Sequence, residues 1–278
     1  MPATTEKLAL TFGIPKVRVR DLAKEYYVGP GHRMQVVHAL NGVSFDVEEG
    51  EFVALTGRSG CGKTTSLRIV LGLEEQTSGA VEIAGREVNG CGYDRGMVFQ
   101  HAELLPWRTA IENVEFGLEL KGVNKSERRR IAIRMLDFVG LAQSADRRPY
   151  QLSGGMKQRV GLARALTTDP EVLLMDEPFG ALDAQIREEM QTELIKIHEK
   201  TLKTVIFVTH DLDEAVLLSD RVLVFSPHGQ IHEDVSINIP RPRSDPIAIR
   251  GSDEFQKKRY HIWRLLKMTD DPAKAALV

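Results

Sequence analysis

A chain of 278 residues in which 42% are hydrophobic is long enough to bury one substantial core and a smaller subdomain. Its formal net charge of −2 argues against a broadly basic surface, so we expect no nucleic acid among its partners. The two cysteines, Cys61 and Cys91, suit a reducing compartment, which favours the cytosol. Residues 1–15 lack the pattern of a signal peptide, and no apolar stretch is long enough to cross a bilayer.

Five short runs of β-branched and aliphatic residues punctuate the chain, with helical patterns between them. The runs are 52–56, 97–99, 172–175, 205–208 and 222–225. Continuous apolar runs of this length predict strands that are buried on both faces of a mostly parallel sheet. The fold class is therefore α/β.

Four of the five runs end in a polar or glycine-rich element. These elements are a phosphate loop, Gln100, the pair Asp176 and Glu177, and the pair Thr209 and His210. Because the carboxyl ends of parallel strands share one edge of a sheet, where α/β proteins place their ligands, we expect the four elements to form one site.

The phosphate loop spans residues 57–64. Its glycines allow backbone N–H groups to point at phosphate oxygens, and the helix that begins near Lys63 adds the positive end of its dipole. Lys63 supplies a cation for the β- and γ-phosphates, and the Thr64 hydroxyl supplies a ligand for Mg²⁺. The predicted ATP-binding residues here are Gly57, Arg58, Ser59, Gly60, Cys61, Gly62, Lys63, Thr64 and Thr65.

The polar residues at the other strand ends suit hydrolysis. Asp176 is positioned to hold the metal ion, and Glu177 is positioned to orient or deprotonate an attacking water. His210 is either a structural residue or, as the shared edge favours, a contact to the γ-phosphate that holds Glu177 in register. The amide of Gln100 can ligate Mg²⁺ or position water. The predicted catalytic residues are Glu177, His210 and Gln100, and the predicted metal ligands are Thr64, Gln100 and Asp176.

A second glycine-rich turn, in the run 152–158, precedes a helix predicted over 156–166. The Ser153 hydroxyl and free N–H groups at a positive helix end suit a γ-phosphate. The alternative is an ordinary helix N-cap. Two phosphate-binding elements on one chain point to an ATP-driven machine.

The middle of the chain, between Gln100 and about Arg164, reads as an inserted helical subdomain, with one helix predicted over 127–139. Ser126 is its expected N-cap and Gly140 its expected stop. Beyond residue 225 the spacing of prolines favours an extended connector, which is followed by a closing helix over 253–268. No internal repeat is evident, so the chain carries one set of motifs.

With these motifs in this order, the chain resembles the ATP-binding subunit of an ABC transporter over essentially its whole length. The resemblance implies a P-loop NTPase core with a parallel central sheet, an N-terminal antiparallel β subdomain and an inserted α-helical subdomain. The nucleotide-binding domain is expected over 17–226, with the helical subdomain at about 101–164, and 227–278 as an extension without a separate domain. By the same resemblance Tyr26, with Tyr27 as the alternative, stacks on adenine.

In that family two ATP-binding domains pair head to tail, so the resemblance implies a dimer, with a second copy of this chain as the expected partner. The residues expected to contact ATP bound by the other copy are Ser153, Gly154, Gly155, Gln158 and Asp183. Transmembrane permease subunits would contact residues 100–116. There Trp107 is either part of this coupling surface, which we favour, or a core residue.

Four segments most resemble the nitrate, sulfonate and taurine importer branch of the family. They are residues 94–100, 105–107, 181–185 and 239–243. The expected function is ATP hydrolysis, with Mg²⁺, that drives import of a small anion delivered by a solute-binding protein. The subunit would lie in the cytoplasm, peripheral to the inner face of the cell membrane. The alternatives are an exporter ATPase and a soluble ABC ATPase without a membrane partner.

Overall fold

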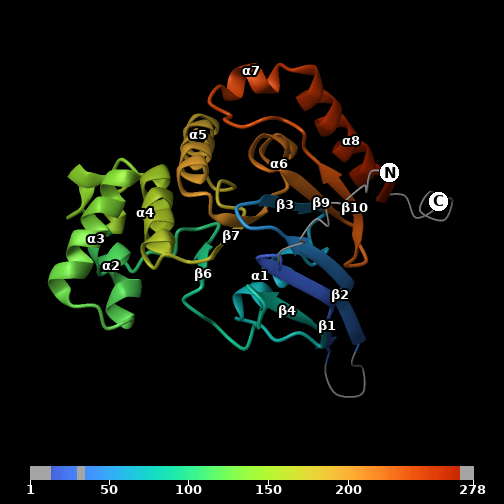
Figure 1. Cartoon of the computed structure of the whole chain (residues 1–278), viewed down its shortest axis with the longest axis horizontal. Coiled ribbons are helices and arrows are strands. Elements are labelled where there is room, and N and C mark those ends of the chain that lie inside the picture. The colour runs from blue at the N-terminus through green and yellow to red at the C-terminus, as the bar shows by residue number, and fades with distance from the viewer. Residues whose placement is uncertain (1–13, 30–34, 270–278) are drawn as a thin grey trace, which may run out of the picture.

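In a computed structural model of the chain, which describes residues 14–29 and 35–269, the strands form two sheets (Figure 1). The larger has the order β10-β9-β3-β8-β7-β6, and the smaller has the order β2-β1-β4-β5. The strands are β1 (Val17–Val28), β2 (Gln35–Val47), β3 (Phe52–Gly57), β4 (Ser78–Ile83), β5 (Arg86–Glu87), β6 (Arg95–Val98), β7 (Val172–Asp176), β8 (Thr204–Val208), β9 (Arg221–Phe225) and β10 (Ile231–Ser236).

The larger sheet is parallel from β9 to β6, as the apolar runs predict. Every residue of β3 and of β8 is buried, which confirms that these strands are covered on both faces. Successive residues face opposite sides, because Ala54 and Phe207 join one core cluster while Leu55 and Val208 join the other. The run at 97–99 corresponds to β6, which begins two residues earlier, at Arg95.

Helices cover the two faces of the larger sheet differently (Figure 1). The face with Leu55 packs on α1 and on the antiparallel sheet of β1, β2, β4 and β5, which confirms the expected β subdomain. The other face packs on α5, α6 and α8. The helices are α1 (Lys63–Leu71), α2 (Ala110–Leu120), α3 (Lys125–Phe138), α4 (Gly154–Thr167), α5 (Ala184–Thr201), α6 (Leu212–Leu218), α7 (Pro246–Arg250) and α8 (Asp253–Thr269).

The helices α2, α3 and α4 form a group beyond β6, at one side of the molecule (Figure 1). The N-cap predicted for α3 is wrong, because the helix begins at Lys125 and the cap is Asn124 rather than Ser126. The Asn124 side chain accepts a hydrogen bond of 3.0 Å from the Glu127 N–H, and Ser126 donates to that same oxygen. Similarly, α4 begins at Gly154, two residues before the predicted start.

The chain beyond β9 packs on the main core. The expected connector contains a strand, β10, which pairs antiparallel with β9, so the sequence missed this element. Arg243 is fully buried and donates hydrogen bonds to the carbonyl oxygens of Leu217, Ser219 and Ile239. The helix α8 buries Phe255, Ile262 and Leu265 in the core shared with α6. We call β10, α7 and α8, with their connections, the C-terminal extension.

Candidate functional site

The phosphate loop connects β3 to α1, as predicted, and its geometry requires glycine at specific positions. Gly62 has a φ of 95°, and a Cβ there would lie 2.3 Å from the carbonyl oxygen of Ala39. Gly60 has a φ of 80° but faces open space. Gly62 also precedes α1 as an N-cap without a side chain, so no side chain caps the N–H groups of the first turn.

Lys63 lies inside this loop and is only 6% exposed. Its Nζ donates hydrogen bonds of 2.8 Å to the carbonyl oxygens of both Gly57 and Arg58. The ammonium group is thereby held within the turn of the loop. A cation enclosed by backbone in this way is available to phosphate oxygens that approach the same turn.

The end of β7 lies against the start of α1. The Thr64 hydroxyl donates a hydrogen bond of 3.0 Å to Oδ1 of Asp176, although 112 residues separate the two. Burial raises the pKa of the Asp176 carboxyl, the Thr64 hydrogen bond lowers it, and the negative charge of Glu177 raises it further. A hydroxyl and a carboxylate side by side are oxygen ligands of the kind that Mg²⁺ prefers.

The next pair joins the ends of β7 and β8. Nδ1 of His210 lies 3.0 Å from Oε2 of Glu177, and the His210 side chain is 65% exposed. Glu177 has a φ of 44°, in the left-handed region, and its N–H donates to the carbonyl oxygen of Val208. The backbone of Glu177 is therefore fixed to β8, with its carboxylate facing the imidazole. This arrangement can hold and move a proton at the carboxylate.

Gln100 follows the end of β6, as predicted, and its amide lies on the same side of Gly180 as the Glu177 carboxylate. A Cβ built on Gly180 would be 3.2 Å from Nε2 of Gln100 and 3.7 Å from Oε2 of Glu177. The polar ends of β3, β6, β7 and β8 therefore lie along one edge of the sheet, as the sequence predicts.

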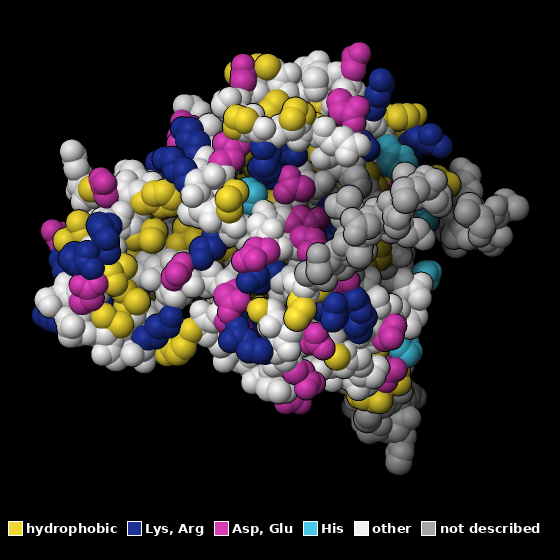
Figure 2. Space-filling view, viewed as in Figure 1, with side chains coloured by type: hydrophobic (Ala, Val, Ile, Leu, Met, Phe, Trp, Pro, Cys, Tyr) yellow, Lys and Arg dark blue, Asp and Glu magenta, His cyan; other side chains and the backbone are white. Residues whose placement is uncertain are grey.

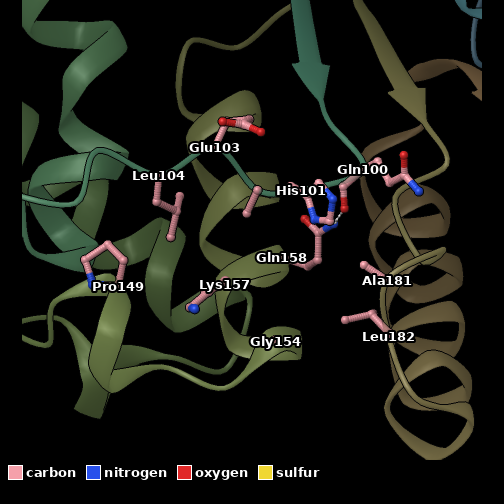
Figure 3. Close-up of a pocket in the computed structure, with 11 residues that line it drawn as sticks. Gln100, His101, Glu103, Leu104, Pro149, Gly154, Lys157, Gln158, Ala181 and Leu182 are labelled. Carbon is pink, nitrogen blue, oxygen red and sulfur yellow. Dashed lines mark hydrogen bonds between the residues drawn. The ribbon is translucent and has the colours of Figure 1, made fainter.

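Gln158, expected to contact ATP on a second copy, is instead buried in its own chain. Its side chain is 4% exposed and points from α4 into its own chain (Figure 3). Nε2 donates to the carbonyl oxygens of Phe99 at 3.2 Å, Gln100 at 2.6 Å and Pro178 at 2.6 Å. An amide that is buried and bonded in this way is not presented to another molecule, which contradicts the expected contact to ATP on a second copy.

Ser153, at the start of α4, is the N-cap of that helix. Its hydroxyl accepts a hydrogen bond of 3.3 Å from the Met156 N–H, so the ordinary capping role is present in the single chain. Ser153 and Gly154 are exposed, whereas Gly155 is buried. Asp183 is likewise exposed and caps α5, accepting from the Ile186 N–H at 3.0 Å. Both caps lie on the surface of the chain, and α4 lies with the helical group, away from α1 (Figure 1).

A cavity of about 360 Å³ opens next to this surface, between the loop after β6 and the start of α4 (Figure 3). His101, Leu104, Pro149, Lys157 and Leu182 are among its lining residues. Further along the same loop Trp107 is 67% exposed, so the alternative that places this residue in the core is wrong. Figure 2 shows hydrophobic side chains over the helical group. The exposed ones there include Leu120 in α2 and Ile133 in α3, and Tyr150 is exposed just before α4.

The side chains of Tyr26 and Tyr27 lie on opposite faces of β1. The Tyr26 hydroxyl bonds to Glu74 and to Thr65, beside α1, and burial raises the pKa of its phenol. Nζ of Lys24 lies 5.1 Å from the centroid of the Tyr26 ring. Tyr27 follows on the other face of β1 and is 62% exposed. Of the two tyrosines, Tyr26 is therefore the one on the side of the phosphate loop.

In the part of the chain that the structure describes, no helix combines the length and apolar character needed to cross a membrane. Within the same residues, no group of three or more His, Cys, Asp or Glu side chains is arranged to hold a metal ion.

Comparisons of the sequence with known proteins identify one family. The profile of the family described as "ABC transporter" matches residues 40–180. An ABC transporter ATP-binding protein of Methanocaldococcus jannaschii is 52% identical over 91% of this chain and 91% of its own length. A taurine import ATP-binding protein of Rhizobium johnstonii is 46% identical over 87% of this chain and 94% of its own. A nitrate import ATP-binding protein of Synechocystis is 46% identical over 85% of this chain and 91% of its own length.

Among solved structures, the chain is similar to an ATP-binding cassette determined as a dimer in a post-hydrolysis state with ADP and phosphate. The TM-score is 0.70 at 34% identity, and the match covers 81% of this chain and 100% of that one. A second dimeric structure, of a bacterial ABC transporter cassette, has a TM-score of 0.71 at the same identity and coverage.

Proposed function

Because the chain belongs to the ABC transporter family, we propose that it is the ATP-hydrolysing subunit of an import system for a small anion. Relatives named for taurine and nitrate import support this class of cargo, since both compounds carry a negatively charged oxyanion group. Sulfonates and related organic acids belong to the same class. The chain itself holds the machinery for ATP, and separate permease subunits would carry the anion.

The observation that supports hydrolysis most directly is the meeting of two pairs at one sheet edge: Thr64 with Asp176, and Glu177 with His210. In the proposed site Lys63 binds the β- and γ-phosphates, and Thr64 and Asp176 hold Mg²⁺. Mg²⁺, when bound, neutralises charge that develops on the phosphates.

Around this centre the other residues orient the reactants. Glu177 orients and deprotonates the attacking water, and His210 holds the Glu177 carboxylate toward the γ-phosphate. Gln100 contributes its amide, which ligates Mg²⁺ or positions the attacking water. Tyr26 stacks on adenine, and the phosphates lie along residues 57–65.

The proposed site is completed by a second copy of the chain. Ser153, Gly154, Gly155 and Asp183 would contact ATP that is bound to Lys63 of the other copy. The exposed positions of Ser153, Gly154 and Asp183 and the dimeric state of the similar solved cassettes support this assignment. Gln158 is excluded from the group because its amide is bonded within its own chain.

The exposed surface around Trp107 and the cavity beside Leu104 would receive a permease subunit, which would hold this chain at the inner face of the cell membrane. A solute-binding protein would deliver the anion from outside. Residues 17–226 form the proposed nucleotide-binding domain, with the helical subdomain at about 101–164.

The substitution Glu177→Gln tests the proposed chemistry. We expect turnover to fall by at least about a hundredfold, because the amide accepts no proton from water, while ATP binding is retained and an ATP-bound dimer accumulates. Phosphate release and size-exclusion chromatography with ATP measure both effects. Glu189→Gln, on the exposed side of α5, is the matched control. Normal hydrolysis by Glu177→Gln would remove Glu177 from its role, and a wild-type chain without ATPase activity would overturn the proposal.

The cargo is tested separately, by expressing the chain with its permease and binding protein and measuring uptake of labelled nitrate and taurine. ATP-dependent uptake of an anion into the cell supports import. Outward transport, or hydrolysis that no anion stimulates in the complete complex, would contradict it.

A further inference from the structure

A path of polar side chains leads from the C-terminal extension to the loop that carries His210. It begins at Arg250 in α7, whose Nη2 donates a hydrogen bond of 2.6 Å to Oε1 of Gln191 in α5. Nε2 of Gln191 donates in turn to Oε1 of Glu214 in α6, at 3.2 Å. The other carboxylate oxygen of Glu214 accepts a hydrogen bond of 2.5 Å from the hydroxyl of Thr209, the residue before His210. Three hydrogen bonds therefore connect Arg250 to this loop.

The loop end of this path is tightly constrained. The Thr209 hydroxyl donates to Glu214 and also accepts a hydrogen bond of 3.0 Å from the Asp211 N–H, on the other side of His210. The Thr209 N–H donates to the carbonyl oxygen of Leu55 in β3. The backbone after His210 is thus bonded to the Thr209 hydroxyl and the backbone before it to β3, and the direction of that hydroxyl depends on the Glu214 carboxylate.

The middle of the path is buried, so its members have few alternative partners. Glu214, Gln191 and Thr209 are each less than 5% exposed, at 4%, 3% and 2%. Burial and the negative charge of Asp211 raise the pKa of Glu214, whereas the Thr209 and Gln191 hydrogen bonds and the charge of Arg187 lower it. A buried carboxyl group held by two donors keeps one orientation, since losing either donor leaves a polar oxygen without its partner.

We propose that Glu214 is a positioning residue for His210, and that Arg250 of the C-terminal extension sets the orientation of Glu214 through Gln191. This proposal rests on the proposed role of His210 and Glu177 in hydrolysis. The path reaches the hydrolytic pair and not the phosphate loop, in which Lys63 is bonded to the carbonyl oxygens of Gly57 and Arg58. Disturbing the path therefore lowers kcat for ATP and leaves KM unchanged.

The substitution Arg250→Ala tests the outer end of the path. We expect kcat to fall about three- to tenfold at constant KM, because Gln191 loses its Arg250 donor and the orientation of Glu214 is no longer fixed. Arg259→Ala is the matched control, because Arg259 also joins the extension to α6, through an exposed ion pair with Asp213 at 2.5 Å. A purely structural role of the extension would lower kcat in both variants, and that result would overturn the proposal.

A double-mutant cycle on the full chain tests the connection itself. Glu214→Gln keeps an acceptor for Thr209 but removes the carboxylate, and we expect Arg250→Ala to lower kcat no further in that background. Effects that multiply would show that Arg250 acts by another route and would overturn the proposal. Thermal unfolding of each variant shows whether it is folded. If Glu177→Gln abolishes turnover while Arg250→Ala is fully active, the path is wrong and the proposed function stands.

Discussion

The side-chain amide of Gln158 donates a hydrogen bond of 2.6 Å to the carbonyl oxygen of Pro178 and another of 2.6 Å to that of Gln100. The two carbonyl groups belong to the loops that follow β7 and β6. One side chain from α4 therefore links the two loops that carry Gln100 and Glu177 to each other and to this helix.

Replacing Gln158 tests whether its amide links the two loops within its own chain. Gln158→Leu leaves buried carbonyl oxygens without a donor, so we expect the free energy of unfolding to fall by about 2–4 kcal/mol. Gln158→Glu has the same size but no amide donor, and we expect at least the same loss. Urea denaturation of the chain without nucleotide measures both. Unchanged stability with lost ATPase activity would instead support a contact across the dimer.

Ser153→Arg tests the completion of the site by a second copy. The added side chain projects from an exposed helix cap, so ATP binding to the single chain should persist while dimer closure and hydrolysis are lost. Binding of a fluorescent ATP analogue and size-exclusion chromatography measure the two. Asn124→Arg is the control for loss of a cap, about 1 kcal/mol, because Asn124 caps α3 in the same way. Loss of ATP binding to the single chain would refute this division of labour.

Two glycines of the phosphate loop, Gly60 and Gly62, should respond differently to substitution by alanine. Gly62→Ala places a Cβ 2.3 Å from the Ala39 carbonyl oxygen, in addition to the strain of a φ of 95°, whereas Gly60→Ala meets no atom within 4 Å. We expect Gly62→Ala to lower the free energy of unfolding by about 2–4 kcal/mol and Gly60→Ala by about 1 kcal/mol. Urea denaturation without nucleotide compares them. Equal losses would mean that the contact with Ala39 is relieved by movement of the loop.

His198 makes the stability of the chain dependent on pH. Burial lowers its pKa from 6.5 to about 4, the positive charge of Arg241 adds to this, and Nε2 lies 3.2 Å from the carbonyl oxygen of Gly50. The unfolded chain binds the proton first, so the contribution of His198 is complete above pH 6.5 and is lost as the pH falls toward 4.

Within that window His198 should contribute a loss of about 1.4 kcal/mol per pH unit. Urea denaturation between pH 7 and pH 4 measures it, and His198→Gln should reduce the slope. His228→Gln, at an exposed position, is the control and should leave the slope unchanged. Equal slopes for wild type and His198→Gln would show that His198 is not the group responsible.

Much of the nucleotide edge was predictable from the sequence, because its signals are local. Apolar runs predict β3, β7, β8 and β9, and the residues that follow these strands share an edge in any parallel sheet. The glycine spacing of residues 57–64 predicts the phosphate loop in the same way. The pairs Thr64 with Asp176 and Glu177 with His210 follow from that placement.

Other features depend on contacts between distant segments, for which the sequence carries no local signal. Asn124 and Ser126 are both good N-caps, and only the backbone path selects Asn124. The sequence favours a surface position for Trp107 but also allows a core position, and only the packing of the helical group shows that it is exposed. The strand β10 forms because β9 offers a free edge, although its own sequence is only partly apolar.

By itself, the sequence determined the family, the parallel sheet, the phosphate loop and the order of the hydrolytic residues, since each depends on short runs of neighbouring residues. The tertiary structure alone decided the direction of the Gln158 amide and the path from Arg250 to Thr209. The physical reason is that a buried polar side chain takes whichever partners the fold brings within about 3 Å, and those partners come from elements far apart in the chain.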